Sequence, residues 1–169
     1  KVRILSSLAF NSKISKHKCL MEGIEKIDLK DIKIANQLDL RIKLLGISEL
    51  KNGCLFETVH PCLVSKNSYI GNVSGVMNAV ILEGKPVGES ILQGEGAGPG
   101  PTSSALMSDL LSILRGNIKY PFGINDKRRK KIKTYRCFKF CRQIIQFHQF
   151  IYKFVNNQKH LIIESTKRS

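Results

Sequence analysis

The stretch Gly94-Glu-Gly-Ala-Gly-Pro-Gly-Pro-Thr102 joins a glycine-rich turn to the apolar run 103–115, and the rest of the chain is interpreted around it. Its glycines permit positive φ angles and close approach of a ligand, while its prolines restrict the loop. Thr102 or Ser103 suits the N-cap of the following helix, and Gly116 suits its C-terminal end. Between these ends apolar residues recur at helical spacing, at Leu106, Met107, Leu110, Leu111, Ile113 and Leu114.

Two interpretations of this loop follow from its spacing. The free N–H groups and the positive dipole end of the helix start are suited to holding a phosphate. The glycine spacing differs from G-x-G-x-x-G, however, and no Lys-Ser/Thr pair follows as in a P-loop. From spacing alone, a plain turn before a core helix is therefore the favoured interpretation.

The net charge of +15 on the 169 residues lies mainly in the C-terminal part. Residues 1–123 have a net charge of +4, whereas residues 124–169 have +11. The run Lys-Arg-Arg-Lys-Lys at 127–131, with aromatic residues after it, is a composition that can bind single-stranded nucleic acid. Because charge runs are commonly solvated tails, we do not expect a nucleic-acid partner. A non-catalytic α/β scaffold with a nucleic-acid-binding tail stays the alternative function.

Cysteine usage and hydropathy indicate a cytoplasmic protein without a metal. Five cysteines are an odd number at no framework spacing, which is typical of reduced thiols. Cys137-x3-Cys141, with His148 and His160 downstream, does not have the spacing of common zinc fingers. We find no signal peptide and no apolar run that could span a bilayer, so no membrane partner is expected. Lys1 stands directly inside an apolar pattern, and we expect an earlier part of the helix to be absent.

Apolar periodicity predicts helices and two antiparallel strand pairs in the body. Helical spacing occurs over residues 2–10 and 32–38, the second with Asp28 or Asp31 as a cap. Asn52-Gly53 is a strong hairpin signal, and a second turn is expected around Gly84-Lys85. The strands around these two turns are expected over 40–50 with 54–64, and over 73–83 with 86–93. Helices flanking a mixed, partly antiparallel sheet indicate the α/β or α+β class.

Several short motifs occur in the order and at the distances found in one enzyme family. The most specific is Gly-x-Gly-Ala-Gly-x-x-Pro-Thr-x-Ser-Ala, which starts at Gly94 and is followed by Asp109-Leu110. The others are Lys1-Val-Arg-Ile-Leu, Glu22-Gly-Ile24, Asp31-Ile-x-x-Ala35, Ile42-Lys-Leu-Leu45, His60-Pro61, Val76-Met-Asn-Ala-Val80 and Val87-Gly88. As an ordered set through about residue 124, they resemble homoserine dehydrogenase.

The resemblance implies an activity and a domain plan. The activity is reduction of aspartate semialdehyde to homoserine with NADP or NAD as cofactor, in threonine, methionine and isoleucine biosynthesis. The plan is a Rossmann domain, a catalytic domain whose mixed sheet forms a homodimer, and a C-terminal segment that returns to the Rossmann domain. On this chain, residues 1–93 would be the C-terminal portion of the catalytic and dimerisation domain. Residues 94–123 would be the returning loop and helix, and residues 124–169 a basic tail, disordered or out of frame.

The resemblance also assigns three site residues. The family's Asp-x-x-x-Lys signature ends at a lysine that matches Lys1, which would be the catalytic proton donor to the substrate carbonyl oxygen. An ammonium suits this role because hydride addition creates an alkoxide that must be protonated. Gly98 matches a position whose backbone contacts the nicotinamide cofactor, and Gly96 is its neighbour in the same cofactor-binding loop. A side chain at such a contact would collide with the ligand.

The departures from the family pattern limit what this sequence can do. In the family, the dinucleotide fingerprint, another catalytic lysine and the acidic substrate-binding residues precede the position of Lys1. We therefore expect the 169-residue chain alone to be inactive. Many members continue into a regulatory ACT domain, whose pattern residues 125–169 lack. Our hypothesis is that the reading frame was lost near Lys133–Tyr135.

Overall fold

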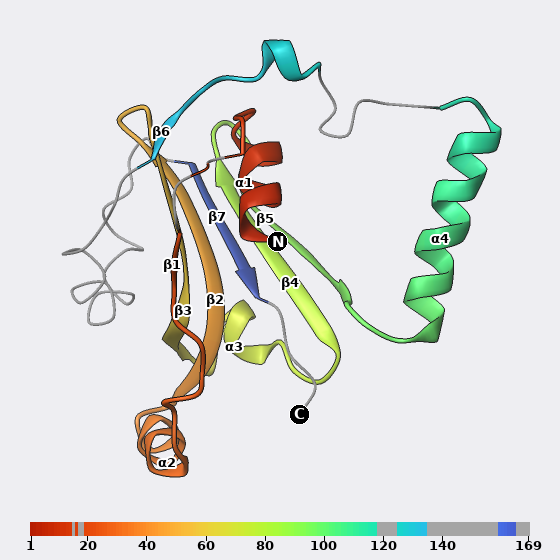
Figure 1. The fold of residues 1–169 in the computed structure, drawn as a ribbon. Helices are drawn as coiled ribbons and strands as arrows, with labels where there is room; N and C mark the ends of the chain where they lie inside the picture. Colours follow the sequence, from red (N-terminus) through yellow and green to blue (C-terminus); the bar gives the residue numbers. More distant parts are fainter. Residues whose placement is uncertain (15, 17–18, 118–124, 135–158, 165–169) are drawn as a thin grey trace.

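The computed structural model describes residues 1–14, 16, 19–117, 125–134 and 159–164 (Figure 1). They form a seven-stranded mixed sheet, which confirms the α/β class. In sheet order the strands are β1 (Leu20–Met21), β3 (Cys54–Ser65), β2 (Leu40–Lys51), β7 (Lys159–Glu164), β4 (Met77–Gly84) and β5 (Gly88–Glu95), with β6 (Lys133–Thr134) beside β3. The helices are α1 (Val2–Ala9), α2 (Leu29–Gln37), α3 (Tyr69–Asn72) and α4 (Pro99–Leu114), with a short 3-10 turn at Asp126–Arg128.

Both predicted hairpins are present. Asn52 and Gly53 have φ angles of 50° and 72° between β2 and β3, and positive φ at both positions is what a tight primed turn requires. The β4–β5 hairpin closes at the pair Gly84 and Gly88. Strand β4 begins at Met77 rather than at the expected Val73. The preceding segment contains α3, a four-residue helix that periodicity does not reveal, and Val73 is the C-cap of that helix.

The apolar core lies on both faces of the sheet, since alternate residues of β2 and β3 point to opposite sides. On one face, Val2 and Phe10 in and beside α1 pack against Leu55 of β3, with Val80 and Leu82 of β4 around them. On the other face the cluster is formed by Leu45, Cys62 and Ile70, with Ile47, Val64 and Ile81. Each cluster contains residues of both hairpins, so the packing holds the hairpins together.

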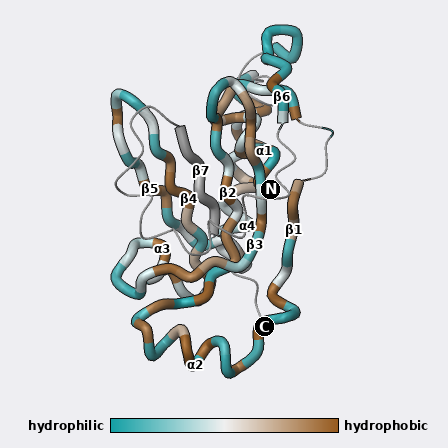
Figure 2. Tube along the Cα trace, turned by 90° about the vertical axis from the view of Figure 1, so that its left-hand side faces the viewer, coloured by the Kyte–Doolittle hydropathy of each residue, from teal (hydrophilic) through white to brown (hydrophobic). Residues whose placement is uncertain are grey.

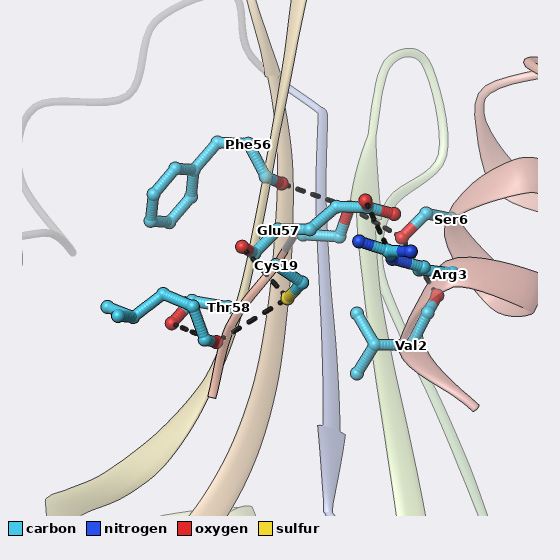
Figure 3. Close-up of polar contacts among 9 residues, drawn as sticks. Val2, Arg3, Ser6, Cys19, Phe56, Glu57 and Thr58 are labelled. Atoms are coloured by element: carbon cyan, nitrogen blue, oxygen red, sulfur yellow. Dashed lines mark hydrogen bonds and ion pairs between the residues drawn. The ribbon is translucent and has the colours of Figure 1, made fainter. Parts of the chain in front are cut away.

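A layer of polar side chains lies between α1 and the sheet, next to the apolar cluster. The Ser6 hydroxyl donates to Ser48 Oγ at 2.7 Å, and both residues are buried. Arg3 Nε lies 3.9 Å from the Glu57 carboxylate, whose side chain is only 2% exposed (Figure 3). These contacts fix the first turns of α1 against β2 and β3, and they fix the backbone of Lys1 with them.

Helices α2 and α4 leave most of their apolar residues uncovered. Of the two caps considered for α2, Asp28 is the N-cap, in a reciprocal capping box with Asp31, but Ala35 is the one buried residue in that helix. Apolar and polar residues alternate along α2 in Figure 2. No residue of α4 is buried, and Figure 1 shows the helix standing away from the sheet. Apolar stripes of this kind are built to pack on a further layer of protein.

The segment 125–134 is attached to the body rather than being a free basic tail. Arg129, in the middle of the charge run, is 8% exposed, and its guanidinium donates to the carbonyl of Ser12. Asp126 accepts from Lys13 Nζ at 3.0 Å and lies 3.3 Å from Arg129 Nη1. The expectation for residues 124–169, a basic tail that is disordered or out of frame, stays a prediction. Within the described segment, one charge of the run, that of Arg129, is used for packing.

Residues 159–164 are also part of the described structure. They form β7, which lies in the middle of the sheet and pairs antiparallel with both β2 and β4. The physical reason is the apolar triplet Leu161-Ile-Ile163 within the basic tail, since apolar runs of this kind are typical of strands covered on both faces. The other features predicted for the tail, including Cys137, Cys141 and His148, lie outside the described residues.

Acid is expected to loosen the attachment of segment 125–134. The hydrogen bond from Lys13, together with the charges of Lys13 and Arg129, holds the pKa of Asp126 below its ordinary value of 3.8, although desolvation opposes this shift. Because the pKa of Asp126 is lowered in the attached state, the ionised carboxylate stabilises the attachment fully above pH 3.8. That stabilisation is lost as the pH falls through the lowered pKa of Asp126. The readout is the NMR signal of the Lys130 amide, which donates to Asn11 O at 3.1 Å.

The matched control is Asp126→Asn, which removes the titrating group while keeping the side-chain shape. In that variant the pH-dependent part of the Lys130 signal should disappear. An acid transition of equal size in Asp126→Asn would show that another group controls the attachment.

Candidate functional site

Lys1 stands at the N-cap of α1, where its carbonyl accepts from the amides of Ile4 and Leu5 at 3.0 and 3.1 Å. Its side chain is exposed and makes no capping hydrogen bond. The helix it precedes is anchored by buried Val2 and by the polar layer around Ser6. The structure thus gives Lys1 a well-fixed backbone and an ammonium group that is not used as a helix cap.

Gly98 is the N-cap of α4 and has φ 125° and ψ 164°. This φ lies in the range that favours glycine, so a side chain here would be strained. Space is not the constraint, because a Cβ at this position would meet only Pro101 Cδ, at 3.6 Å. The backbone conformation alone therefore accounts for the glycine.

Gly96 is a glycine for a different reason. A Cβ built there would collide with the Asn78 side chain of β4, so the loop lies directly against that side chain. The Gly96 amide also donates to Val76 O at 3.0 Å. The absence of a side chain at Gly96 lets the loop close onto the end of β4.

The start of α4 differs from the expectation. The helix begins at Pro99, and the hydroxyls of Thr102 and Ser103 donate back to Gly98 O and Pro99 O at 2.7 and 2.6 Å, so neither residue is the N-cap. Proline suits the first helical position, which moves the start toward the loop. Proline also lacks an N–H, so Pro99 and Pro101 remove two of the donors that a phosphate would need at this helix end.

The structure does not bring the predicted catalytic and cofactor residues into contact. Within the part of the chain that the structure describes, no hydrogen bond or ion pair joins Lys1 to the loop 96–98. In Figure 1 the N-terminus lies beside the sheet, and α4 begins beyond the far end of β5. Lys1 and Gly98 thus share no direct polar contact in the described part of the chain.

Sequence reasoning missed Asn78 and Glu57, which position the loop and α1. Asn78 had a visible signal, since it is the one polar residue in the otherwise apolar Val76-Met-Asn-Ala-Val80. Glu57 had none, because its partner Arg3 is distant in the sequence. Over the described ranges we find no cluster of His, Cys, Asp or Glu that could hold a metal ion, and no helix long and apolar enough to cross a membrane.

Comparison with known proteins identifies the family. The homoserine dehydrogenase family model matches residues 1–111. Among curated relatives, the homoserine dehydrogenase of Neisseria gonorrhoeae is 43% identical over 115 residues, which are 68% of this chain and 26% of that protein. The homoserine dehydrogenase of Helicobacter pylori is 37% identical over 133 residues, which are 79% of this chain and 32% of that protein. A solved homoserine dehydrogenase from Thiobacillus denitrificans superposes with a TM-score of 0.72 at 26% identity, covering 98% of this chain and 44% of that one.

These matches identify the chain as part of an oxidoreductase domain with a mixed α/β sheet. It belongs to the homoserine dehydrogenase family. The chain spans 26–32% of the length of the two curated relatives above. The exposed apolar faces of α2 and α4 agree with a polypeptide that covers part of a larger fold.

Proposed function

We propose that this chain supplies the C-terminal part of the catalytic unit of a homoserine dehydrogenase, which reduces aspartate semialdehyde to homoserine. The observation that carries the proposal is the family match over residues 1–111, which includes both Lys1 and the loop with Gly98. In the reaction, the carbonyl carbon of the substrate would receive a hydride from a bound NADPH or NADH. Lys1 donates a proton to the carbonyl oxygen, and its ammonium stabilises the charge that develops there.

The loop around Gly98 forms one wall of the cofactor site in this proposal. Gly98 and Gly96 present backbone without a side chain, so the loop fits a close backbone contact with a cofactor. The exposed apolar residues of α4, such as Leu106 and Leu114, then pack on the nucleotide-binding domain. Two copies of the enzyme pair through the sheet.

A chimera tests the proposal. Residues 1–117 of this chain replace the corresponding part of the N. gonorrhoeae enzyme, and NADPH oxidation is followed with aspartate semialdehyde. The chimera should be active, whereas the 169-residue chain alone should not be. A folded chimera that binds NADPH but has no activity would contradict the proposal, and so would activity of the chain alone.

A further inference from the structure

A carboxylate is buried beneath the first turn of α1. Glu57 lies on β3 between Leu55 and Val59, and the three side chains share the face of the strand that packs against α1, because alternate residues of a strand point the same way. Leu55 and Val59 belong to the apolar cluster around Val2, so the Glu57 side chain, 2% exposed, lies in apolar surroundings. An ionised group in such a place needs a compensating charge close by.

The compensating charge comes from α1. Arg3 Nε lies 3.9 Å from Glu57 Oε2 (Figure 3), and this oxygen accepts no hydrogen bond from the residues that the structure describes. The two partners are unequally fixed, since the Arg3 side chain is 32% exposed. Glu57, in contrast, is held on β3, which pairs with β2 along its whole length. The carboxylate is therefore the fixed point, and the helix turn is the part that can move.

The ion pair adds a directional contact beside an apolar one. Val2, Leu5 and Ser6 form one face of α1, which carries the apolar packing and the hydrogen bond to the sheet. Apolar packing is non-directional, so it tolerates small rotations of the helix about its axis. Arg3 lies at the flank of this face, and its contact with Glu57 opposes such a rotation.

The orientation of this first turn determines where Lys1 points. The Lys1 carbonyl accepts from the amides of Ile4 and Leu5 at 3.0 and 3.1 Å, so the Lys1 backbone moves with the turn. Its side chain is exposed and makes no capping hydrogen bond that would orient it. A proton donor must lie within hydrogen-bond reach of its acceptor, and a misplacement of about 1 Å can lower the rate by about 10²-fold.

We infer that Glu57 is a positioning residue for Lys1, because its buried carboxylate fixes the rotation of α1 through Arg3 and thereby directs the Lys1 ammonium. This role rests on the proposed function, in which Lys1 is the proton donor. It assigns to a buried residue of β3 an effect on the reaction rate that is transmitted only through α1.

Hydrogen exchange of the full 169-residue chain is the first test, and it needs no activity. Glu57→Gln removes the charge and keeps the side-chain shape. Exchange at the amides of Ile4 and Leu5 should then rise at least about tenfold, while the β2–β3 amides keep their protection. Asp39→Asn is the matched control, because it removes one carboxylate from the exposed pair with Lys66. This control should leave exchange at both amides unchanged.

Steady-state kinetics of the chimera is the second test. Glu57→Gln should lower kcat by about 10- to 100-fold with KM unchanged, since a misplaced proton donor affects the chemical step. In a chimera that already carries Lys1→Ala, Glu57→Gln should lower kcat no further, because Glu57 acts through Lys1. A merely structural role would lower kcat in both backgrounds. Asp39→Asn should have the kcat of the unmodified chimera.

Unchanged exchange at Ile4 and Leu5 in Glu57→Gln would overturn the inference, and so would equal losses of kcat with and without Lys1→Ala. An unchanged kcat in Glu57→Gln, where Lys1→Ala lowers kcat, would also overturn it and leave the proposed function standing. If Lys1→Ala left kcat unchanged, the proposed function would fail instead, and exchange would still decide whether Glu57 holds the turn. If Glu57→Gln does not fold, Glu57→Asp, which withdraws the carboxylate from Arg3, takes its place with the same expected results.

Discussion

Lys1→Ala in the chimera is expected to lower kcat by about 10²–10⁴-fold, the usual contribution of a general acid. The effect should fall on kcat rather than on KM, because the proton is needed only once the alkoxide begins to form. The substitution should cost little stability, since the Lys1 side chain is exposed and does not cap α1. Steady-state NADPH oxidation with aspartate semialdehyde measures both constants.

Lys33→Ala is the matched control, because Lys33 is an exposed lysine on helix α2 and has no role in the proposed site. Its kcat should equal that of the unmodified chimera. If Lys1→Ala retained full kcat, or if its loss matched that of Lys33→Ala, Lys1 would not be the proton donor. A rise in KM with unchanged kcat would assign Lys1 to substrate binding instead.

Leu55→Ala is expected to lower the free energy of unfolding by about 2–5 kcal/mol, the range for a leucine truncated inside a packed core. Leu55 is 2% exposed and is the β3 member of the cluster with Val2 and Phe10. Its removal leaves a cavity beneath α1 that backbone-anchored neighbours on β2 and β3 cannot fill. Urea unfolding of the 169-residue chain, followed by circular dichroism, gives the difference.

The control for the core prediction is Leu92→Ala on β5, where the side chain is 62% exposed. This change should stay within about 0.5 kcal/mol of the wild type, as is usual for surface positions. Equal losses in the two variants would mean that Leu55 is not a core residue. A change in the urea m-value would signal an altered unfolded or native state rather than a lost contact.

Local rules were sufficient where one short segment decides the outcome. Asn52-Gly53 specifies its hairpin because few other pairs accept two positive φ angles, and Asp28 specifies the start of α2 through its capping box. The same rules failed at Thr102, because the prolines before it start the helix earlier. They failed at β7, because the basic composition of residues 124–169 obscured the short apolar triplet within them.

The candidate site was far less accessible to such rules. Lys1 and Gly98 have no distinguishing local pattern, and they were assigned through the ordered resemblance to the family. The contacts of Glu57 with Arg3, and of Asn78 with Gly96, join residues that are distant in the sequence, so no local periodicity reports them. Both pairs depend on the tertiary arrangement, which only the folded chain defines.

The central position of β7 also has a kinetic consequence. Leu45 pairs with Glu164, so the middle of the sheet closes only after a long stretch of intervening chain has been made and brought back. Contacts of such high sequence separation are slow to form, because the entropy of loop closure is lost before the pairing is gained. During synthesis the facing edges of β2 and β4 therefore stay unpaired until β7 has been made. In that time a strand of another polypeptide can pair with these edges, which favours aggregation.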